Sequence, residues 1–159
     1  MQLELGVLLA AAASVLAALV AGIGSMIGVG MAGQAGAGVV SEEPEKFGSV
    51  LVLQLLPGTQ GIYGLLIAFV IATKAGLLGG GVNVTASQGL QFLLAALPIA
   101  FGGLISAMWQ ARVAVSGIAL VAKRGEESGK AIILTVMVET YAVLSLLISF
   151  LLVNGVQVG

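Results

Sequence analysis

A single acidic residue, Glu139, lies deep inside a long apolar stretch of the sequence. It follows Glu126 by 13 residues, which at 1.5 Å per helical residue corresponds to about 20 Å from the nearest charged segment. An ionised carboxylate is costly to hold in hydrocarbon, so an acid at such a depth indicates a functional site by default. We therefore expect the chemistry of this chain to centre on Glu139.

Two glutamines are predicted to share the depth of this carboxylate. Gln60 lies 14 residues after Lys46, and Gln110 lies 13 residues before Lys123, so both stand about as far from a charged segment as Glu139 does. Three polar side chains from three different segments thus fall in one layer. The alternative for the two glutamines is hydrogen bonding between helices alone.

The segment around Gln60 adds further polar groups to this layer. Leu56, Thr59, Gln60 and Tyr63 are spaced i, i+3, i+4 and i+7, which places them on one helical face. Pro57 has no N–H, so we expect a kink here that exposes carbonyl groups such as that of Leu56. Two alternatives stay open: that Thr59 only bonds back to its own helix, and that Tyr63 only hydrogen-bonds Glu139.

Together these groups form a ligand set made only of oxygen atoms: a carboxylate, amides, a hydroxyl and a backbone carbonyl. Hard cations prefer such ligands. One negative charge matches a monovalent ion, because a divalent ion would leave a net charge buried. The pattern therefore predicts Na⁺ as the bound ion, with H⁺ as its competitor.

The composition indicates a membrane protein. Of the 159 residues, 59% are hydrophobic and only 8% are charged, whereas about a quarter of the residues in a soluble domain are charged. Six basic against seven acidic residues leave no positive excess for binding nucleic acid. The chain contains no Cys and no His, which excludes disulfides, thiolate chemistry and imidazole catalysis.

Charged clusters divide the chain into four apolar lengths that each suffice to cross a membrane as a helix. These predicted spans cover residues 5–40, 47–78, 85–122 and 128–153. Most basic residues lie at the turns after the first and third spans, whereas Lys74 lies at the opposite end. The positive-inside tendency thus predicts cytoplasmic charged turns and both termini outside the cell, in a multi-pass protein of the cell membrane whose first span is retained.

The two halves of the chain form a repeat with an offset of 81 residues. Identical pairs include Gly22 and Gly103, Ser25 and Ser106, and Thr59 and Thr140. We therefore predict a single membrane domain over 1–159, with a first hairpin at 1–80 and a second, carboxylate-bearing hairpin at 81–159. The glycine-rich segment 22–38 favours close helix packing, either around a ring axis or inside one four-helix bundle.

These residues resemble a known family. The segments LPGTQG (56–61) and VETYA (138–142), together with Gln110, are similar to the rotor-ring proteolipid of V-type ATPases (the K or c subunit), most closely its bacterial sodium-translocating branch. The resemblance covers nearly the whole chain. It implies an all-α ring of identical subunits surrounded by lipid, a stator membrane subunit that supplies an Arg, and a central-stalk subunit that contacts the cytoplasmic loops.

The resemblance also implies roles for individual residues. Glu139, Gln110, Gln60 and Thr59 would supply side-chain ligands to Na⁺, and Leu56 would supply its backbone carbonyl. Tyr63 would hydrogen-bond the carboxylate. The repeat places Gly58 at the position equivalent to Glu139, so each subunit is expected to carry one ion.

Other functional interpretations remain at this point. The first is a ring that carries H⁺ in place of Na⁺, and the second is a small secondary transporter or pore. The chain has no phosphate-binding loop, so we expect a non-catalytic subunit of a rotary pump. The remaining charge within a span, Arg112, is expected to serve packing and orientation by reaching toward the interface.

Overall fold

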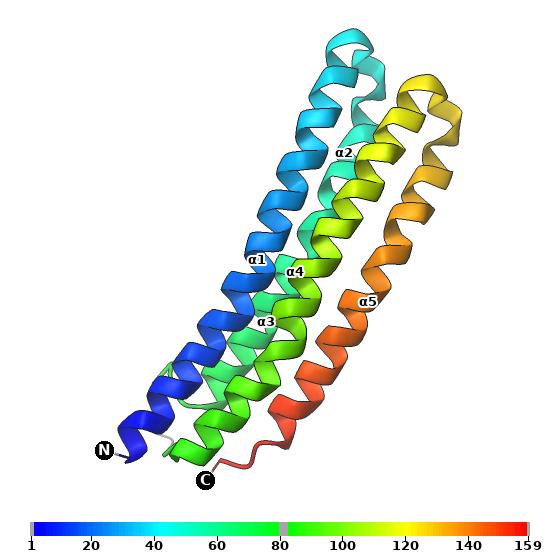
Figure 1. Cartoon of the computed structure of the whole chain (residues 1–159). Coiled ribbons are helices and arrows are strands. Elements are labelled where there is room, and N and C mark those ends of the chain that lie inside the picture. The colour runs from blue at the N-terminus through cyan, green and yellow to red at the C-terminus, as the bar shows by residue number, and fades with distance from the viewer. Residues whose placement is uncertain (1, 80–82, 159) are drawn as a thin grey trace.

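The computed structural model describes residues 2–79 and 83–158, and the regular structure within them is entirely helical (Figure 1). The elements are α1 (Gln2–Glu42), η1 (Pro44–Lys46), α2 (Phe47–Leu55), η2 (Leu56–Gly58), α3 (Thr59–Lys74), α4 (Ala86–Lys123), η3 (Gly125–Glu127) and α5 (Ser128–Gly155). The predicted all-α class is therefore confirmed. The predicted boundary between hairpins at residues 80 and 81 lies outside the described residues.

Four helical segments of the described chain are long and apolar enough to cross a membrane, as the composition predicts. The second segment, α2 to α3, ends at Lys74, although the sequence suggested that it continues to Leu78. Leu77 and Leu78 kept the segment apolar, but Gly76 adopts a φ of 69° that a helix cannot contain. The backbone conformation at Gly76 therefore ends the helix, although apolar residues continue as far as Leu78.

The helices form two hairpins that lie side by side, with α1 and α4 packed against each other along most of their length (Figure 1). Glycines permit this close approach. A Cβ atom on Gly24 of α1 would lie only 2.7 Å from the Cα atom of Leu104 in α4. A Cβ atom on Gly64 of α3 would lie 2.6 Å from the Cβ atom of Ala21. Small residues therefore allow backbones to touch where lipid gives no hydrophobic driving force.

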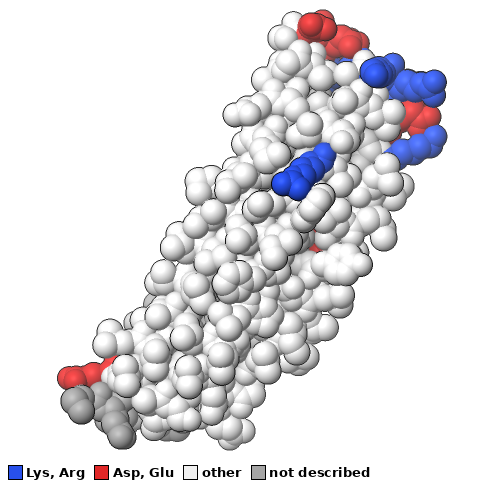
Figure 2. All heavy atoms as spheres, in the orientation of Figure 1, with Lys and Arg blue, Asp and Glu red and all other residues white. Residues whose placement is uncertain are grey.

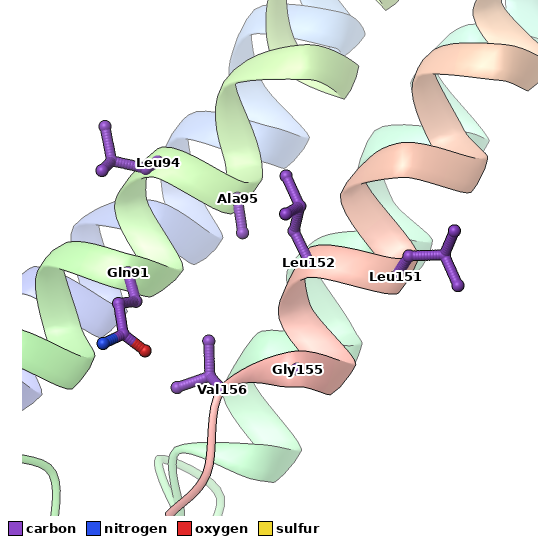
Figure 3. A pocket seen from close by; sticks show the side chains of 7 residues that line it. All are labelled: Gln91, Leu94, Ala95, Leu151, Leu152, Gly155 and Val156. Carbon is purple, nitrogen blue, oxygen red and sulfur yellow. The ribbon is translucent and has the colours of Figure 1, made fainter.

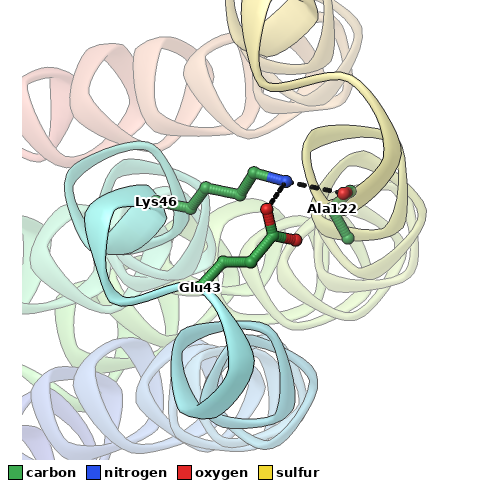
Figure 4. Close-up of polar contacts among 3 residues, drawn as sticks. All are labelled: Glu43, Lys46 and Ala122. Carbon is green, nitrogen blue, oxygen red and sulfur yellow. Dashed lines mark hydrogen bonds and ion pairs between the residues drawn. The ribbon is translucent and has the colours of Figure 1, made fainter.

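Charged side chains gather mainly at the end of the bundle that carries the α1–α2 and α4–α5 turns (Figure 2). At this end, the ammonium group of Lys46 lies 2.5 Å from a carboxylate oxygen of Glu43 and donates a hydrogen bond of 2.6 Å to the carbonyl of Ala122 (Figure 4). A cation there complements the negative end of the α4 dipole. At the opposite end, Lys74 donates to the carbonyls of Val153 and Asn154. Two lysines of the first hairpin thus hold two helix ends of the second.

The tight glycine contacts predict a sharp difference between two alanine substitutions. We expect Gly64→Ala to destabilise the subunit by about 1–3 kcal/mol, because the added methyl group would overlap the carbonyl oxygen of Ala17. Gly48→Ala is the matched control, since a Cβ atom there meets nothing within 4 Å. Thermal unfolding of both variants in detergent measures the effect. Equal midpoints would contradict the role given to these contacts.

Candidate ion-binding site

Glu139 lies near the middle of α5, with its side chain partly buried against the neighbouring helices. The hydroxyl of Tyr63, from α3, donates a hydrogen bond of 2.5 Å to Oε1 of this carboxylate. The side-chain amide of Gln110, from α4, donates one of 3.3 Å to Oε2. Both carboxylate oxygens therefore face polar groups of other helices, which offsets part of the energy of removing the carboxylate from water.

Gln60 and Gln110, the two glutamines predicted to lie at the depth of Glu139, are fully buried and hydrogen-bonded to each other. The Nε2 atom of Gln60 lies 2.5 Å from the Oε1 atom of Gln110. The same Nε2 also donates to the hydroxyl of Ser106, and Nε2 of Gln110 donates to the backbone carbonyl of Thr135. Hydrogen bonding between helices, one of the alternatives, is thus present. It coexists with the direct contact between Gln110 and Glu139.

Thr59 and Leu56 extend this cluster at the break in the second span. Pro57 lies in the short 3₁₀ segment η2, which separates α2 from α3 at the place where the sequence predicts a kink. The hydroxyl of Thr59 donates to the carbonyl of Leu56 at 3.0 Å and lies 3.4 Å from Oε1 of Gln60. Thr59 therefore bonds back to the preceding turn, η2, and also contacts the glutamine pair.

All six residues singled out from the sequence are thus brought together in one continuous hydrogen-bonded cluster. They are Glu139, Gln110, Gln60, Thr59, Leu56 and Tyr63. The cluster offers carboxylate, amide, hydroxyl and carbonyl oxygens, which suit a hard monovalent cation and do not suit a transition metal. Within the described residues, no group of three or more His, Cys, Asp or Glu side chains offers an alternative metal site.

The sequence reasoning gave no role to three residues that support the cluster. Ser106 accepts from Gln60 and donates to the carbonyl of Val138, which joins α3, α4 and α5. Thr135 supplies the carbonyl that holds Gln110, and Ser25 accepts from the backbone N–H of Gly61. Two features of the sequence could have pointed to Ser106. It is identical to its repeat equivalent Ser25, and it lies one helical turn before Gln110, on the same face of the helix.

The first hairpin has no counterpart of this cluster. The positions equivalent to Glu139 and Gln110 are Gly58 and Val29. A Cβ atom on Gly58 would lie 3.3 Å from a methyl group of Val29, so these two positions lie side by side just as Glu139 and Gln110 do. The repeat therefore keeps these two positions side by side and replaces the polar side chains of Glu139 and Gln110 with Gly58 and Val29.

Arg112 does not belong to the cluster. Its side chain is exposed, and its guanidinium carbon lies 4.4 Å from the centroid of the Trp109 ring. This contact is a cation–π interaction. Arg112 thus packs on the ring of Trp109, and its role in orienting the helix toward the interface stays a prediction.

The fold and the cluster define a class of small membrane proteins in which two similar helical hairpins surround one carboxylate. Residues 9–71 and 93–152 match the ATP synthase C-subunit family, one match for each hairpin. The chain belongs to this family. Its members are non-catalytic proteolipids that assemble into rings, as the resemblance to the rotor-ring proteolipids implied.

Two relatives place the chain more closely within the family. It is 52% identical over 148 residues to the V-type sodium ATPase subunit K of Enterococcus hirae, covering 93% of this chain and 92% of that protein. It is 42% identical over 152 residues to the A-type ATP synthase subunit K of Methanocaldococcus jannaschii, covering 96% of this chain and 64% of that protein. The resemblance to the V-type ATPase proteolipid, sodium branch, is thus confirmed.

The contact between Tyr63 and Glu139 yields a testable expectation. Tyr63→Phe removes a donor to the carboxylate, and a hydrogen bond to a charged group contributes roughly 1.5–3 kcal/mol. The carboxyl group of Glu139 then lacks this partner, so its labelling by a hydrophobic carbodiimide in sodium-free buffer should accelerate about tenfold. Tyr141→Phe is the control, because it removes the hydroxyl of an exposed tyrosine on the same helix as Glu139. Equal acceleration in both variants would argue against this specific bond.

Proposed function

We propose that this chain is the ion-translocating rotor-ring subunit of a V-type ATPase and carries one Na⁺ at Glu139. The single observation that carries the proposal is the hydrogen-bonded cluster that joins Glu139 of α5 to Gln110 of α4 and to Tyr63 of α3. The side chains of Glu139, Gln110, Gln60 and Thr59 and the carbonyl of Leu56 are the proposed ligands. Tyr63 is proposed to hold the carboxylate in place.

Binding requires a modest rearrangement of the glutamine pair. In the present arrangement Gln110 directs its amide nitrogen toward Glu139 and its oxygen toward Gln60. Rotation of the Gln110 amide would turn its oxygen toward a cation beside the carboxylate. Gln60 and Thr59 would then present their oxygens to the same ion. Such a number of oxygen acceptors around one point favours Na⁺ over H⁺, since a protonated carboxyl group needs few acceptors.

The proposed mechanism is electrostatic. With Na⁺ bound, the charge of Glu139 is neutralised, which allows this part of the ring to face lipid. Without Na⁺ the bare carboxylate must lie opposite a cation, for which we propose an Arg of a stator membrane subunit. Rotation then carries loaded sites between two half-channels. ATP hydrolysis in a soluble sector that this chain does not contain supplies the torque.

The distribution of charged residues supports one orientation of the chain in the membrane and indicates which end of the bundle contacts another subunit. Lys46, Lys123, Arg124 and Lys130 lie at the α1–α2 and α4–α5 turns, whereas Lys74 lies at the other end. We propose that the charged turns are cytoplasmic and contact a central-stalk subunit, and that both termini lie outside the cell.

Carbodiimide labelling of Glu139 tests the bound ion. We expect Na⁺ at fixed pH to protect Glu139 of intact rings, because bound Na⁺ keeps the carboxylate from taking the proton that the reagent requires. Gln110→Ala should raise the Na⁺ concentration for half-protection by about tenfold or more, since one ligand bond to a charged partner contributes roughly 1.5–3 kcal/mol. Gln91→Ala is the matched control, as it removes a glutamine from another part of α4.

The outcomes separate the competing ions and classes of protein. Labelling that follows pH and ignores Na⁺ would establish a proton-carrying ring instead. A purified species the size of a monomer or dimer would favour the transporter or pore.

A second measurement addresses stoichiometry. Because Gly58 and Val29 occupy the equivalent positions in the first hairpin, saturation with radioactive sodium should give about one ion per subunit. Equilibrium binding to purified rings, with Glu139→Gln rings as the blank, gives this ratio. A ratio near two would require a second site in the first hairpin.

A further inference from the structure

Two pairs of small residues that the repeat relates to each other lie against the beginning of α3. They are Gly22 with Ser25 in α1 and Gly103 with Ser106 in α4, each spaced i and i+3 on one helical face. A Cβ atom on Gly61 would lie 3.5 Å from the Cα atom of Gly22. A Cβ atom on Gly103 would lie 3.7 Å from the Cβ atom of Gln60. The two pairs therefore contact consecutive residues of α3.

The serine of each pair also accepts a hydrogen bond from α3, and the two bonds reach different parts of the same segment. The Oγ atom of Ser25 accepts from the backbone N–H of Gly61 at 2.7 Å. The Oγ atom of Ser106 accepts from Nε2 of Gln60 at 3.2 Å. Helix α1 therefore holds the backbone next to Gln60, whereas α4 holds the side chain of Gln60.

Helix α5 fixes the direction of the hydrogen bond at Ser106. A serine hydroxyl has one hydrogen to donate, and that of Ser106 donates to the backbone carbonyl of Val138 at 3.1 Å. The lone pairs of the hydroxyl are left to accept, so the nitrogen of the Gln60 amide faces Ser106. The oxygen of the same amide faces Thr59 instead, 3.4 Å from its hydroxyl. The residue before Glu139 thus determines which end of the Gln60 amide faces Thr59.

The rearrangement proposed for ion binding makes the bond to Ser106 more important. In the present structure Nε2 of Gln60 has two acceptors, Oε1 of Gln110 and Oγ of Ser106. Rotation of the Gln110 amide toward a cation would withdraw the first of these acceptors. Ser106 would then be the one of the two that remains, and a buried amide nitrogen without an acceptor is costly.

We propose that Ser106 and Ser25 are positioning residues for the bound ion. Ser106 directs Oε1 of Gln60 toward the cation, and Ser25 holds the α3 backbone where Gln60 and Thr59 present their oxygens. Both serines act through Gln60, and neither is a ligand of the ion. The inference rests on the proposed function, in which Gln60 is a ligand, and adds the groups that set the orientation of that ligand.

A serine elsewhere between α4 and α5 provides a matched control. Toward the termini these two helices border a pocket that is lined by residues such as Gln91, Leu94 and Leu152 (Figure 3). Between this pocket and the polar cluster, Ser149 of α5 accepts a hydrogen bond of 3.0 Å from the backbone N–H of Ile99. Ser149 is buried, as Ser106 is. Ser149→Ala therefore removes a buried hydrogen bond between the same two helices and leaves the contacts of Gln60 in place.

Sodium protection of Glu139 against carbodiimide labelling, measured on intact rings, tests the proposal. Ser106→Ala should raise the Na⁺ concentration for half-protection by about fivefold, a typical effect of losing one neutral hydrogen bond. Ser25→Ala should raise this concentration by about threefold. The labelling rate in sodium-free buffer should stay unchanged in both variants, because the hydrogen bonds to the carboxylate come from Tyr63 and Gln110. A general loosening of the bundle would change both measurements.

A double-mutant cycle tests whether Ser106 acts through Gln60. In rings that carry Gln60→Ala, the further substitution Ser106→Ala should not raise the Na⁺ concentration for half-protection again, because the partner of the serine is already absent. Ser149→Ala should leave this concentration unchanged with or without Gln60→Ala. It should still lower the midpoint of thermal unfolding, since a buried hydrogen bond is lost.

Specific results would overturn the positioning role. They are an unchanged sodium requirement in Ser106→Ala or Ser25→Ala, an additive increase in the double variant, or an equal increase in Ser149→Ala. Sodium protection of the unsubstituted rings, measured alongside, distinguishes this failure from a failure of the proposed function. If sodium protects the unsubstituted rings and any of these results appears, the positioning role alone is refuted.

Discussion

The energy of holding a carboxylate away from water is the constraint on which the rest of this structure depends. Glu139 is tolerable in the bundle because Tyr63 and Gln110 donate hydrogen bonds to its two oxygens. Those donors come from two other helices, so α3, α4 and α5 must pack closely at this level. Ser106 reinforces the junction by bonding to Gln60 and to the carbonyl of Val138. The packing and the polar cluster therefore depend on each other.

The repeat explains how one chain that is built from two similar hairpins carries a single such cluster. Its two hairpins share some glycine positions, such as Gly22 with Gly103 and Gly36 with Gly117, and each has a charged turn, but they differ where the carboxylate stands, with Gly58 in the place of Glu139. Divergence between the two hairpins thus leaves the chain with one carboxylate at this depth.

Much of the fold and the site was predictable because membranes restrict the possibilities. Hydrophobic length sets four helices, and equal spacing from charged turns brings Gln60, Gln110 and Glu139 to one depth. Hydrophobicity could not locate the end of α3, since the φ of Gly76 ends that helix and not a change in polarity. The sequence also did not predict the supporting contacts of Ser106 and Thr135. Which face of a helix points toward a neighbouring helix depends on how each helix is rotated about its own axis, and only packing fixes that rotation.

The lysines at the two ends of the bundle have a mechanical consequence. Lys46 and Lys74 of the first hairpin tie down the ends of α4 and α5, but their repeat equivalents are Glu127 and Gly155, which have no ammonium group to donate. The contact between the two hairpins of one copy is therefore reinforced at both ends of the bundle by hydrogen bonds from lysine to backbone carbonyls. In a ring of such subunits, we expect harsh detergent to separate whole four-helix subunits from one another before it separates the two hairpins of one subunit.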